Sequence, residues 1–317
     1  MAPVDRKNPV RGAGSESGYS IMEFMREFPD DGACLDYLWR QRYSRDGQTA
    51  WCDRCQQMRT HRRYEGRHSY DCTACGRHVS VTAGTIFHKS STSLQLWFYA
   101  MYVMASTRCG ISAKQLEREL GVTYKTAWRM FNLIRNKLMA DDGEPLTGAV
   151  EADETLIGGK MRNSHRRERE KLGWDRKRYD NERKTMVFAV VEREGRVKAQ
   201  IIPNSSGPTL RGAVRENVEP GTTLYTDEWV GYRTLEADYP RLTIRHRDRV
   251  YAEGDTHTQT IEGFFGLLKN ALRGVHHGVS DKWLQSYLNE YAWRYNNRGR
   301  RNTMFRDLIN ASASEFA

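Results

Sequence analysis

The sequence predicts an α/β domain preceded by smaller modules, and three observations support this. Apolar residues recur at helical spacing as far as Leu138, whereas short β-prone runs alternate with helical patterns after it. Two Cys-x-x-Cys pairs mark a small separate module in the first third of the chain. With 317 residues, the chain is long enough for roughly two domains with their own cores. We therefore expect a layered α/β architecture in the second half.

Composition and charge indicate an anionic partner. The chain has 50 Lys and Arg against 40 Asp and Glu, a net charge of +10 and a pI of about 9.3. Such a surface attracts polyanions, among which nucleic acid is the commonest in solution. No run approaches the length of a membrane span, and residues 1–20 lack the apolar core of a signal peptide. We expect a cytoplasmic protein with no membrane partner.

The chain is predicted to start with a flexible tail, residues 1–20, because Pro, Gly, Ser and scattered charge occur there without a period. Residues 21–90 are predicted to be a helical lead-in and a zinc ribbon. Helical spacing predicts helices over residues 21–28 and 33–40. Cys34 and Cys109, which belong to neither cysteine pair, are expected to be buried.

Four cysteines in two pairs predict the metal site of the ribbon. Each Cys-x-x-Cys turn can present two thiolates to one ion, and sixteen residues between the pairs suit two zinc knuckles. Gly76 suits the tight backbone after the second pair. We expect a structural Zn²⁺ with a β-hairpin over residues 60–70. The four predicted ligands are Cys52, Cys55, Cys72 and Cys75.

Two questions about the ribbon stay open from the sequence. A nearby histidine could replace a thiolate, and an iron–sulfur centre would use the same four ligands. The ribbon either touches DNA through Arg62 and Arg63 or serves only as a structural clip. The histidines concerned are His61, His68 and His78.

Residues 91–140 are predicted to be a helical DNA-binding region. After a helix over residues 94–106, Ser112 and Gln115 form a capping box for a second helix, which Gly121 ends before Thr123 caps a third. This is the layout of a helix-turn-helix. The third helix has one polar face of residue types that read DNA grooves, although any amphipathic helix has a solvated face. That face consists of Lys125, Arg129, Asn132 and Asn136.

Strand and helix patterns then alternate through the α/β part. Strands are predicted over residues 148–153, 185–191, 197–203, 222–226 and 242–245, and helices over residues 208–218, 231–238, 257–273 and 281–296.

Three acids lie on these elements in positions that suit a shared metal. Period-two alternation places Glu151 and Asp153 on one side of the first strand, and Asp227 follows the fourth strand. Glu262 and Lys269 share one face of the helix over residues 257–273. Carboxylates that hold two Mg²⁺ or Mn²⁺ ions can activate an attacking hydroxyl and stabilise a leaving alkoxide in phosphodiester chemistry. Lys269 would hold a phosphate beside them.

With these motifs in place, the chain resembles a bacterial insertion-sequence DDE transposase of the subgroup with an amino-terminal zinc ribbon, the ISXO2-like transposases. The similarity runs from about residue 21 to residue 310, and its segments are EADETLIGG (151–159), YTDEWVGY (225–232), TIEGFFGLLK (260–269) and YLNEYAWRYNNR (287–298). The resemblance implies a ribonuclease H-like catalytic domain over residues 145–310. It also implies that Asp153, Asp227 and Glu262 bind the divalent cation, with Lys269 as the accompanying base.

The resemblance leaves three points open. Gln259 is an alternative third ligand one turn before Glu262, and Glu154 and Glu228 are further acids next to the predicted ones. The basic insertion over residues 160–184 either clamps a DNA backbone or is a solvated loop.

The function implied is that of a transposase acting on double-stranded DNA. Such an enzyme binds the terminal inverted repeats of its element, nicks the ends and joins the 3′-hydroxyls to target DNA. The resemblance also implies a homo-oligomer on paired ends and a location in the bacterial cytoplasm, at the nucleoid. The alternatives are a non-catalytic DNA-binding regulator and a nuclease that does not join.

Overall fold

The computed structural model describes residues 19–107, 109–141, 143–160, 163–193, 195–244, 252–253, 256–300 and 303–314. The chain divides into two compact units, one made of Met1–Leu138 with Gly299–Ala317 and the other of Met139–Arg298. Almost all of the predicted amino-terminal tail lies outside the described residues. In the part of the chain that is described, no helix is long and apolar enough to cross a membrane.

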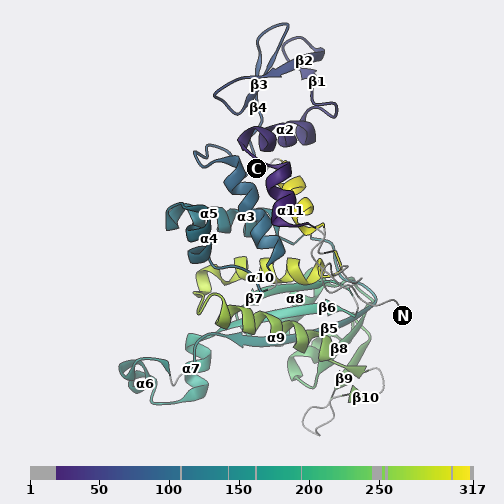
Figure 1. Cartoon of the computed structure of the whole chain (residues 1–317). Coiled ribbons are helices and arrows are strands. Elements are labelled where there is room, and N and C mark those ends of the chain that lie inside the picture. The colour runs from purple at the N-terminus through teal and green to yellow at the C-terminus, as the bar shows by residue number, and fades with distance from the viewer. Residues whose placement is uncertain are drawn as a thin grey trace, which may run out of the picture. The chain divides into compact units, whose positions relative to one another are not determined.

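The first unit opens with two short helices and a small sheet (Figure 1). Helix α2 begins two residues earlier than predicted, because the Asp30 carboxylate accepts the backbone N–H of Ala33. The strands after it are antiparallel, and β2 and β3 form the hairpin predicted over residues 60–70. These elements are α1 (Ile21–Glu27), α2 (Asp31–Arg42), β1 (Thr49–Cys52), β2 (Gln57–Arg63), β3 (Ser69–Cys72) and β4 (His78–Ser80).

The rest of the first unit is helical and includes one helix that the sequence patterns did not predict, α11. This helix packs on α3, and its Phe305 ring lies among the rings of Phe24, Phe28 and Tyr102 at centroid distances of 5.6, 6.1 and 5.7 Å. The carboxyl-terminal residues therefore complete the aromatic core of the first unit. The helices are α3 (Leu94–Ser106), α4 (Ala113–Leu120), α5 (Tyr124–Leu133), the π-helical η1 (Ile134–Leu138) and α11 (Met304–Ser312).

Helices α4 and α5 are joined by the short turn that the sequence predicted. Gly121 ends α4 in the left-handed conformation at φ +64°, and Thr123 caps α5. The predicted capping box of α4 is only half formed. Ser112 accepts the backbone N–H of Gln115, but the Gln115 side chain donates to Glu119 one turn further on.

A five-stranded mixed sheet forms the centre of the second unit, with the strand order β7-β6-β5-β8-β9. The first three strands are antiparallel, whereas β8 pairs parallel with both β5 and β9. Strand β5 extends four residues past its predicted end, because it pairs with β6 as far as Ile157. The strands are β5 (Ala149–Ile157), β6 (Thr185–Glu192), β7 (Val197–Ile202), β8 (Thr223–Asp227) and β9 (Arg241–Ile244), with a small separate hairpin of β10 (Ala252–Glu253) and β11 (Thr256–His257).

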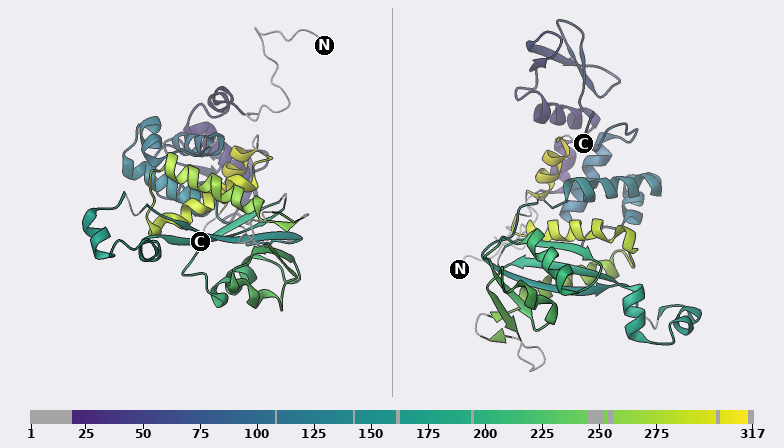
Figure 2. Two further views of the ribbon diagram at one scale, coloured as in Figure 1. Left: turned by 90° about the horizontal axis from the view of Figure 1, so that it is seen from below. Right: turned by 180° about the vertical axis from the view of Figure 1, so that it is seen from behind.

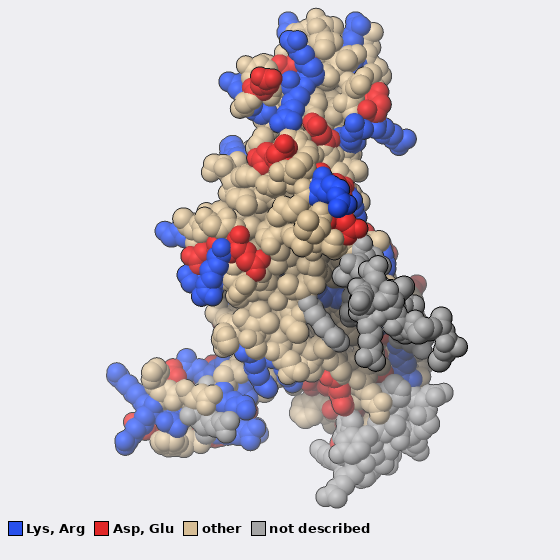
Figure 3. Space-filling view, viewed as in Figure 1, with Lys and Arg blue, Asp and Glu red and all other residues tan. Residues whose placement is uncertain are grey.

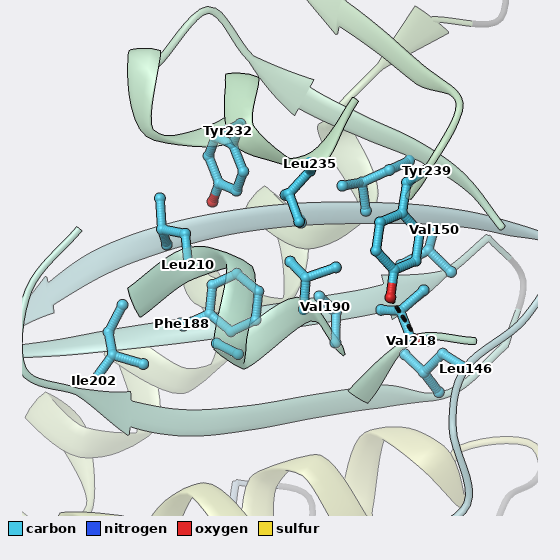
Figure 4. Close-up of a cluster of buried hydrophobic side chains, with 14 residues drawn as sticks. Leu146, Val150, Phe188, Val190, Ile202, Leu210, Val218, Tyr232, Leu235 and Tyr239 are labelled. Atoms are coloured by element: carbon cyan, nitrogen blue, oxygen red, sulfur yellow. Dashed lines mark hydrogen bonds between the residues drawn. The ribbon is translucent and has the colours of Figure 1, made fainter. Parts of the chain in front are cut away.

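Helices cover both faces of this sheet. Alternate residues of β6 separate into two cores: Phe188 and Val190 pack with α8 (Gly207–Asn217) and η3 (Val230–Leu235), whereas Val187 packs with α9 (Gln259–Gly274) and α10 (Asp281–Asn296). Figure 1 shows α9 in front of the sheet, and the view from behind in Figure 2 shows α8 on its other side. Figure 4 shows the core under α8, where the Tyr239 hydroxyl donates to the Val218 carbonyl at 3.0 Å.

Two predicted segments of the second unit differ in detail. The helix predicted over residues 231–238 is a 3₁₀ helix, η3, which ends at Leu235. The basic insertion forms two short helices, α6 (Arg166–Lys171) and α7 (Arg176–Arg183), which stand away from the sheet (Figure 1).

Candidate functional site

Asp153 and Asp227 lie level with each other on neighbouring parallel strands. The register pairs Glu151 of β5 with Tyr225 of β8, so each aspartate is two residues beyond the last position at which these two strands pair with each other. Because residues two apart on a strand share a face, both aspartates point to the side of the sheet that α9 and α10 cover. The strand pairing thus brings the first two predicted acids together.

The third predicted acid reaches this place because α9 is fixed to β5. The helix starts after Thr258, whose side chain makes no capping hydrogen bond. Instead, the fully buried Glu151 carboxylate accepts the backbone N–H groups of Thr260 and Ile261 at 2.9 and 3.1 Å. These N–H groups have no partner inside the helix, and a carboxylate is favoured at this positive end of the helix dipole. Glu262 follows directly on the helix.

The buried charge of Glu151 is balanced by Arg193, in the turn after β6. The Arg193 Nε lies 3.0 Å from the Glu151 carboxylate, and its guanidinium stacks on the Tyr225 ring at 3.7 Å. The pair therefore ties β5, β8 and α9 together beneath the predicted acids. The sequence pattern predicted Glu151 on the same side of the strand as Asp153 but indicated no role for it. A signal was present, since an acid between the apolar residues of a central strand needs a buried partner.

Burial and the neighbouring acids shift the pKa of Asp153. Burial and the charge of Glu154 raise the pKa of Asp153 to about 7, with further contributions from Asp227 and Glu262, although a hydrogen bond from the Glu154 backbone N–H opposes the shift. Among the described residues, no lysine or arginine forms an ion pair with any of the three predicted acids. A divalent cation would supply the missing positive charge.

The spread of the three carboxylates is wider than a single compact metal site. Within the described ranges, only the four predicted cysteines place three or more potential ligand atoms within 4.8 Å of one another. Two ions about 4 Å apart require a wider set of ligands than one ion does. Oxygen ligands of this kind suit Mg²⁺ or Mn²⁺.

Lys269 lies on α9 two turns after Glu262. Its Nζ donates to the Thr155 hydroxyl, two residues beyond Asp153 on the same face of β5. Burial lowers the pKa of Lys269 and the charges of Arg273 and Lys184 act in the same direction, whereas the charge of Asp153 opposes them. The ammonium is therefore at the edge of the acidic cluster.

The alternative metal ligands, Glu154 and Gln259, have surroundings different from those of the three predicted acids. Glu154 accepts a hydrogen bond from the Tyr232 hydroxyl at 2.5 Å, and Tyr232 belongs to the core under α8. Gln259 is the first residue of α9, exposed and one turn before Glu262. The Asp227 carboxylate accepts the backbone N–H of Trp229 at 3.0 Å, which orients it at the end of β8.

The cysteine pairs of the first unit meet as predicted. The Cys52 and Cys75 sulfurs lie 3.6 Å apart and those of Cys55 and Cys72 3.9 Å apart. Four thiolates around one Zn²⁺ at about 2.3 Å would have sulfurs about 3.8 Å apart, so the cluster could hold this ion. Gly76, at φ +70°, makes the tight turn after the second pair.

The histidines near this cluster have other partners. The buried His61 packs on the Trp39 ring, with 5.4 Å between centroids, and the His78 Nδ1 lies 2.5 Å from an Asp71 oxygen. Of the two cysteines outside the pairs, Cys34 is buried as predicted, but Cys109 is exposed, which corrects that expectation. Cys109 lies in the connection between α3 and α4, outside the apolar stripes.

The predicted polar face of α5 lies on the outside of the helix pair. Lys125, Arg129 and Asn136 are exposed and Asn132 is half-buried, while the apolar stripe on the other side is buried. In the ribbon, Arg62 is exposed and Arg63 lies 4.0 Å from Asp36 of α2.

Basic side chains also cover the α6–α7 segment (Figure 3). Much of their charge is balanced inside the segment, with ion pairs from Arg166 to Glu170 and from Arg178 to Glu182. Other exposed basic residues there are Arg167, Lys171 and Lys177.

The mixed α/β fold is compatible with the comparisons with known proteins. A family model described as an ISXO2-like transposase domain matches residues 145–296. A protein of Halobacterium salinarum, described as an uncharacterized protein in transposable element ISH50, is 30% identical over 233 residues, which cover 71% of this chain and 77% of that protein. An uncharacterized transposase-like protein of Haemophilus influenzae is 29% identical over 103 residues, covering 32% of this chain and 82% of that protein.

These similarities define the class of the protein as a transposase of an insertion sequence. Within that class, the chain belongs to the family with an ISXO2-like transposase domain.

Proposed function

We propose that the second unit is a ribonuclease H-like DDE catalytic domain in which Asp153, Asp227 and Glu262 bind two divalent cations. The observation that carries this proposal is the level placement of Asp153 and Asp227 on parallel strands, with α9 fixed beside them through Glu151. The strand order, with three antiparallel strands followed by two parallel ones, supports the assignment of the fold.

The donor set fits Mg²⁺ or Mn²⁺, because carboxylate oxygens are hard ligands. Burial, and after it the neighbouring acids, raises the pKa of Asp153, and a bound cation would favour the charged carboxylate. The bound ions would activate the attacking water or 3′-hydroxyl and stabilise the leaving oxygen. Asp153 and Asp227 would orient the ions from the sheet and Glu262 from the helix. Lys269 would hold a non-bridging phosphate oxygen at the edge of the cluster.

The first unit would recognise the DNA. We propose that the cysteine cluster binds a structural Zn²⁺ and that α4 and α5 form a helix-turn-helix, with Lys125, Arg129, Asn132 and Asn136 in the major groove. We propose that Arg62 and Arg63 contact the DNA backbone. In the second unit, the α6–α7 segment would make a further contact with the DNA backbone. The protein would act as a homo-oligomer on paired terminal inverted repeats, nicking the ends and joining their 3′-hydroxyls to target DNA.

The decisive test uses labelled DNA with the ends of the element and a plasmid target, in Mg²⁺ or Mn²⁺. Asp153→Asn, Asp227→Asn and Glu262→Gln keep the size of each side chain and remove its charge. Nicked and joined products should fall by about 10²–10³-fold in each, the loss typical of removing one group that stabilises a transition state. Arg215→Gln on α8, which is paired with Asp238 on the other face, is the control.

Each alternative function gives a different result. A regulator would bind the ends without nicking them, and a nuclease would nick but fail to join pre-cut 3′ ends. If Glu262→Gln alone keeps activity while Gln259→Ala loses it, the third ligand is Gln259.

A further inference from the structure

A cavity of about 350 Å³ lies in the second unit beside Lys269. It is formed where β5 ends at Ile157 and where α9 ends and turns toward α10. This volume is within the range of about 300–1,000 Å³ that is typical of small-molecule sites. Of the residues proposed above for the metal site, Lys269 alone lines it, and Lys160 and Asn163 lie at the start of the basic insertion over residues 160–184. The site described above leaves the cavity itself without a role.

One part of the cavity lining is cationic. Lys160, Lys269 and Arg273 line it together with His277, and no Asp or Glu is among the described residues that do so. His277 adopts a left-handed backbone conformation at φ +58°, which costs free energy in a residue with a β-carbon. Its neighbour His276 donates to or accepts from the Tyr291 hydroxyl instead, so the turn directs the two histidines to different surroundings.

The remaining lining is apolar or glycine. Ile157, Leu272 and Val279 contribute aliphatic surface, and Gly158 and Gly159 bring bare backbone to the cavity. A β-carbon at Gly158 would lie 2.9 Å from the Lys184 side chain and 3.1 Å from the Arg183 carbonyl, so glycine is required there. A ligand that fits this lining has an anionic group for the cationic residues and a flat, weakly polar part for the aliphatic surface. A nucleotide has both.

One side chain, Lys269, links the cavity to the proposed catalytic cluster. Lys269 lines the cavity and also donates to Thr155, which lies about 7 Å along β5 from Asp153 on the same face. A DNA strand with its reacting phosphate at the acids would therefore have a neighbouring nucleotide within reach of the cavity.

We propose that this cavity holds one unpaired nucleotide of the DNA strand, adjacent to the reacting phosphate. Its phosphate contacts Lys269 and Arg273, and its base lies against Leu272 and Val279. Holding that nucleotide out of the duplex would fix the strand for the reaction. This inference rests on the proposed function, because the acids define where the reacting phosphate lies.

Photocrosslinking tests the proposal without relying on activity. End DNA carries 5-iododeoxyuridine at single positions on either side of the cleavage point, and zinc-loaded full-length protein is irradiated with it in the absence of Mg²⁺ and Mn²⁺. The expected result is a crosslink at one flanking position only, to the peptide that contains Leu272 or Val279.

Two variants alter the cavity in different ways. Arg273→Gln removes a charge, and Gly278→Phe fills space, since a β-carbon at Gly278 meets nothing within 4 Å. Each should lower the crosslink yield by about tenfold, the loss expected from one charge-assisted contact. The matched controls on α8 are Arg215→Gln and Gly212→Phe, whose β-carbon position is also open. Thermal unfolding verifies that every variant folds.

The outcomes separate this proposal from the proposed function. If wild-type protein nicks the ends in Mg²⁺ but crosslinks only outside the cavity peptide, or if Gly278→Phe crosslinks normally, the nucleotide site is wrong and the catalytic proposal stands. If the cavity crosslinks as expected but no nicking occurs, the nucleotide site stands without the catalytic proposal. If neither is observed, both are overturned.

Discussion

The Glu151 carboxylate accepts the backbone N–H of Ile261, 110 positions later in the chain, at 3.1 Å. This bond, with its companion to Thr260, joins the central strand to the start of α9. The position of Glu262 relative to Asp153 thus depends on a buried acid that is not itself among the proposed metal ligands.

Glu151→Ala is expected to reduce both stability and activity. The substitution leaves the Arg193 charge without its carboxylate partner and leaves two buried helix N–H groups without an acceptor. The free energy of unfolding should therefore fall by about 3–5 kcal/mol. Urea denaturation measures this loss. Asp238→Asn, a half-buried acid paired with the exposed Arg215, is the control and should cost less than about 1 kcal/mol. Equal costs at the two positions would contradict the role assigned to Glu151.

Asp153 is expected to make the metal-free protein less stable as the pH rises. Its pKa is about 7 in the folded chain against an ordinary value of 3.8, so between these pH values the folded state binds a proton that the unfolded state has released. The free energy of unfolding therefore falls as the pH rises from about 4 to 7, by about 1.4 kcal/mol per unit of pKa difference. Denaturation of zinc-loaded protein without Mg²⁺ at pH 5 and pH 8 measures it.

The comparison for this pH effect is Asp153→Asn, which cannot titrate at that position. Its stability should change less between pH 5 and pH 8 than that of the wild type. Added Mg²⁺ should stabilise the wild type more at pH 8 than at pH 5, because ion binding competes with the proton. A wild type and variant with parallel pH profiles would show that Asp153 titrates normally.

Cys75→Ser should abolish stoichiometric zinc binding. The wild-type chain is expected to contain one Zn²⁺, and removal of one of four thiolates weakens a structural site that typically contributes about 10–16 kcal/mol of binding free energy. Metal analysis and protease sensitivity of the ribbon are the measurements. The exposed Cys109→Ser is the control and should keep its zinc. Iron with visible absorption in purified protein would instead support the iron–sulfur alternative.

Arg129→Ala should weaken binding to the element ends by about 1–3 kcal/mol and relax the sequence preference at one base pair. Arg129 is exposed on the proposed groove-facing side of α5. Competition binding with end DNA and random DNA measures both effects. Lys114→Ala on α4, where Lys114 is paired with Glu117, is the control. An equal loss for both DNAs would mean that Arg129 contacts only phosphates.

The sequence predicted the local features of this chain better than the long-range ones. Apolar periodicity was enough for the strands β6 and β8 and for helix α10, and cysteine spacing was enough for the cluster in the ribbon. The end of β5 was missed because its last residues are set by pairing with β6, which lies far along the chain. The role of Glu151 was missed for the same reason.

Helix α11 illustrates the limit most clearly. The helix is amphipathic, but nothing in its local sequence shows that Phe305 packs with Phe24 and Phe28, which lie 281 and 277 positions earlier. The prediction of a capping box at α4 was wrong in part for another reason. The Gln115 side chain can hydrogen-bond either to Ser112 or to Glu119, and sequence spacing does not decide between the two.

The return of α11 to the first unit has a consequence for synthesis on the ribosome. Because Phe305 completes the aromatic core that Phe24 and Phe28 begin, the first unit can reach its final packing only after the whole second unit has been translated. A chain cut short after residue 298 would keep its second unit and leave that aromatic core open. Premature termination would thus impair the first part of the protein to be made.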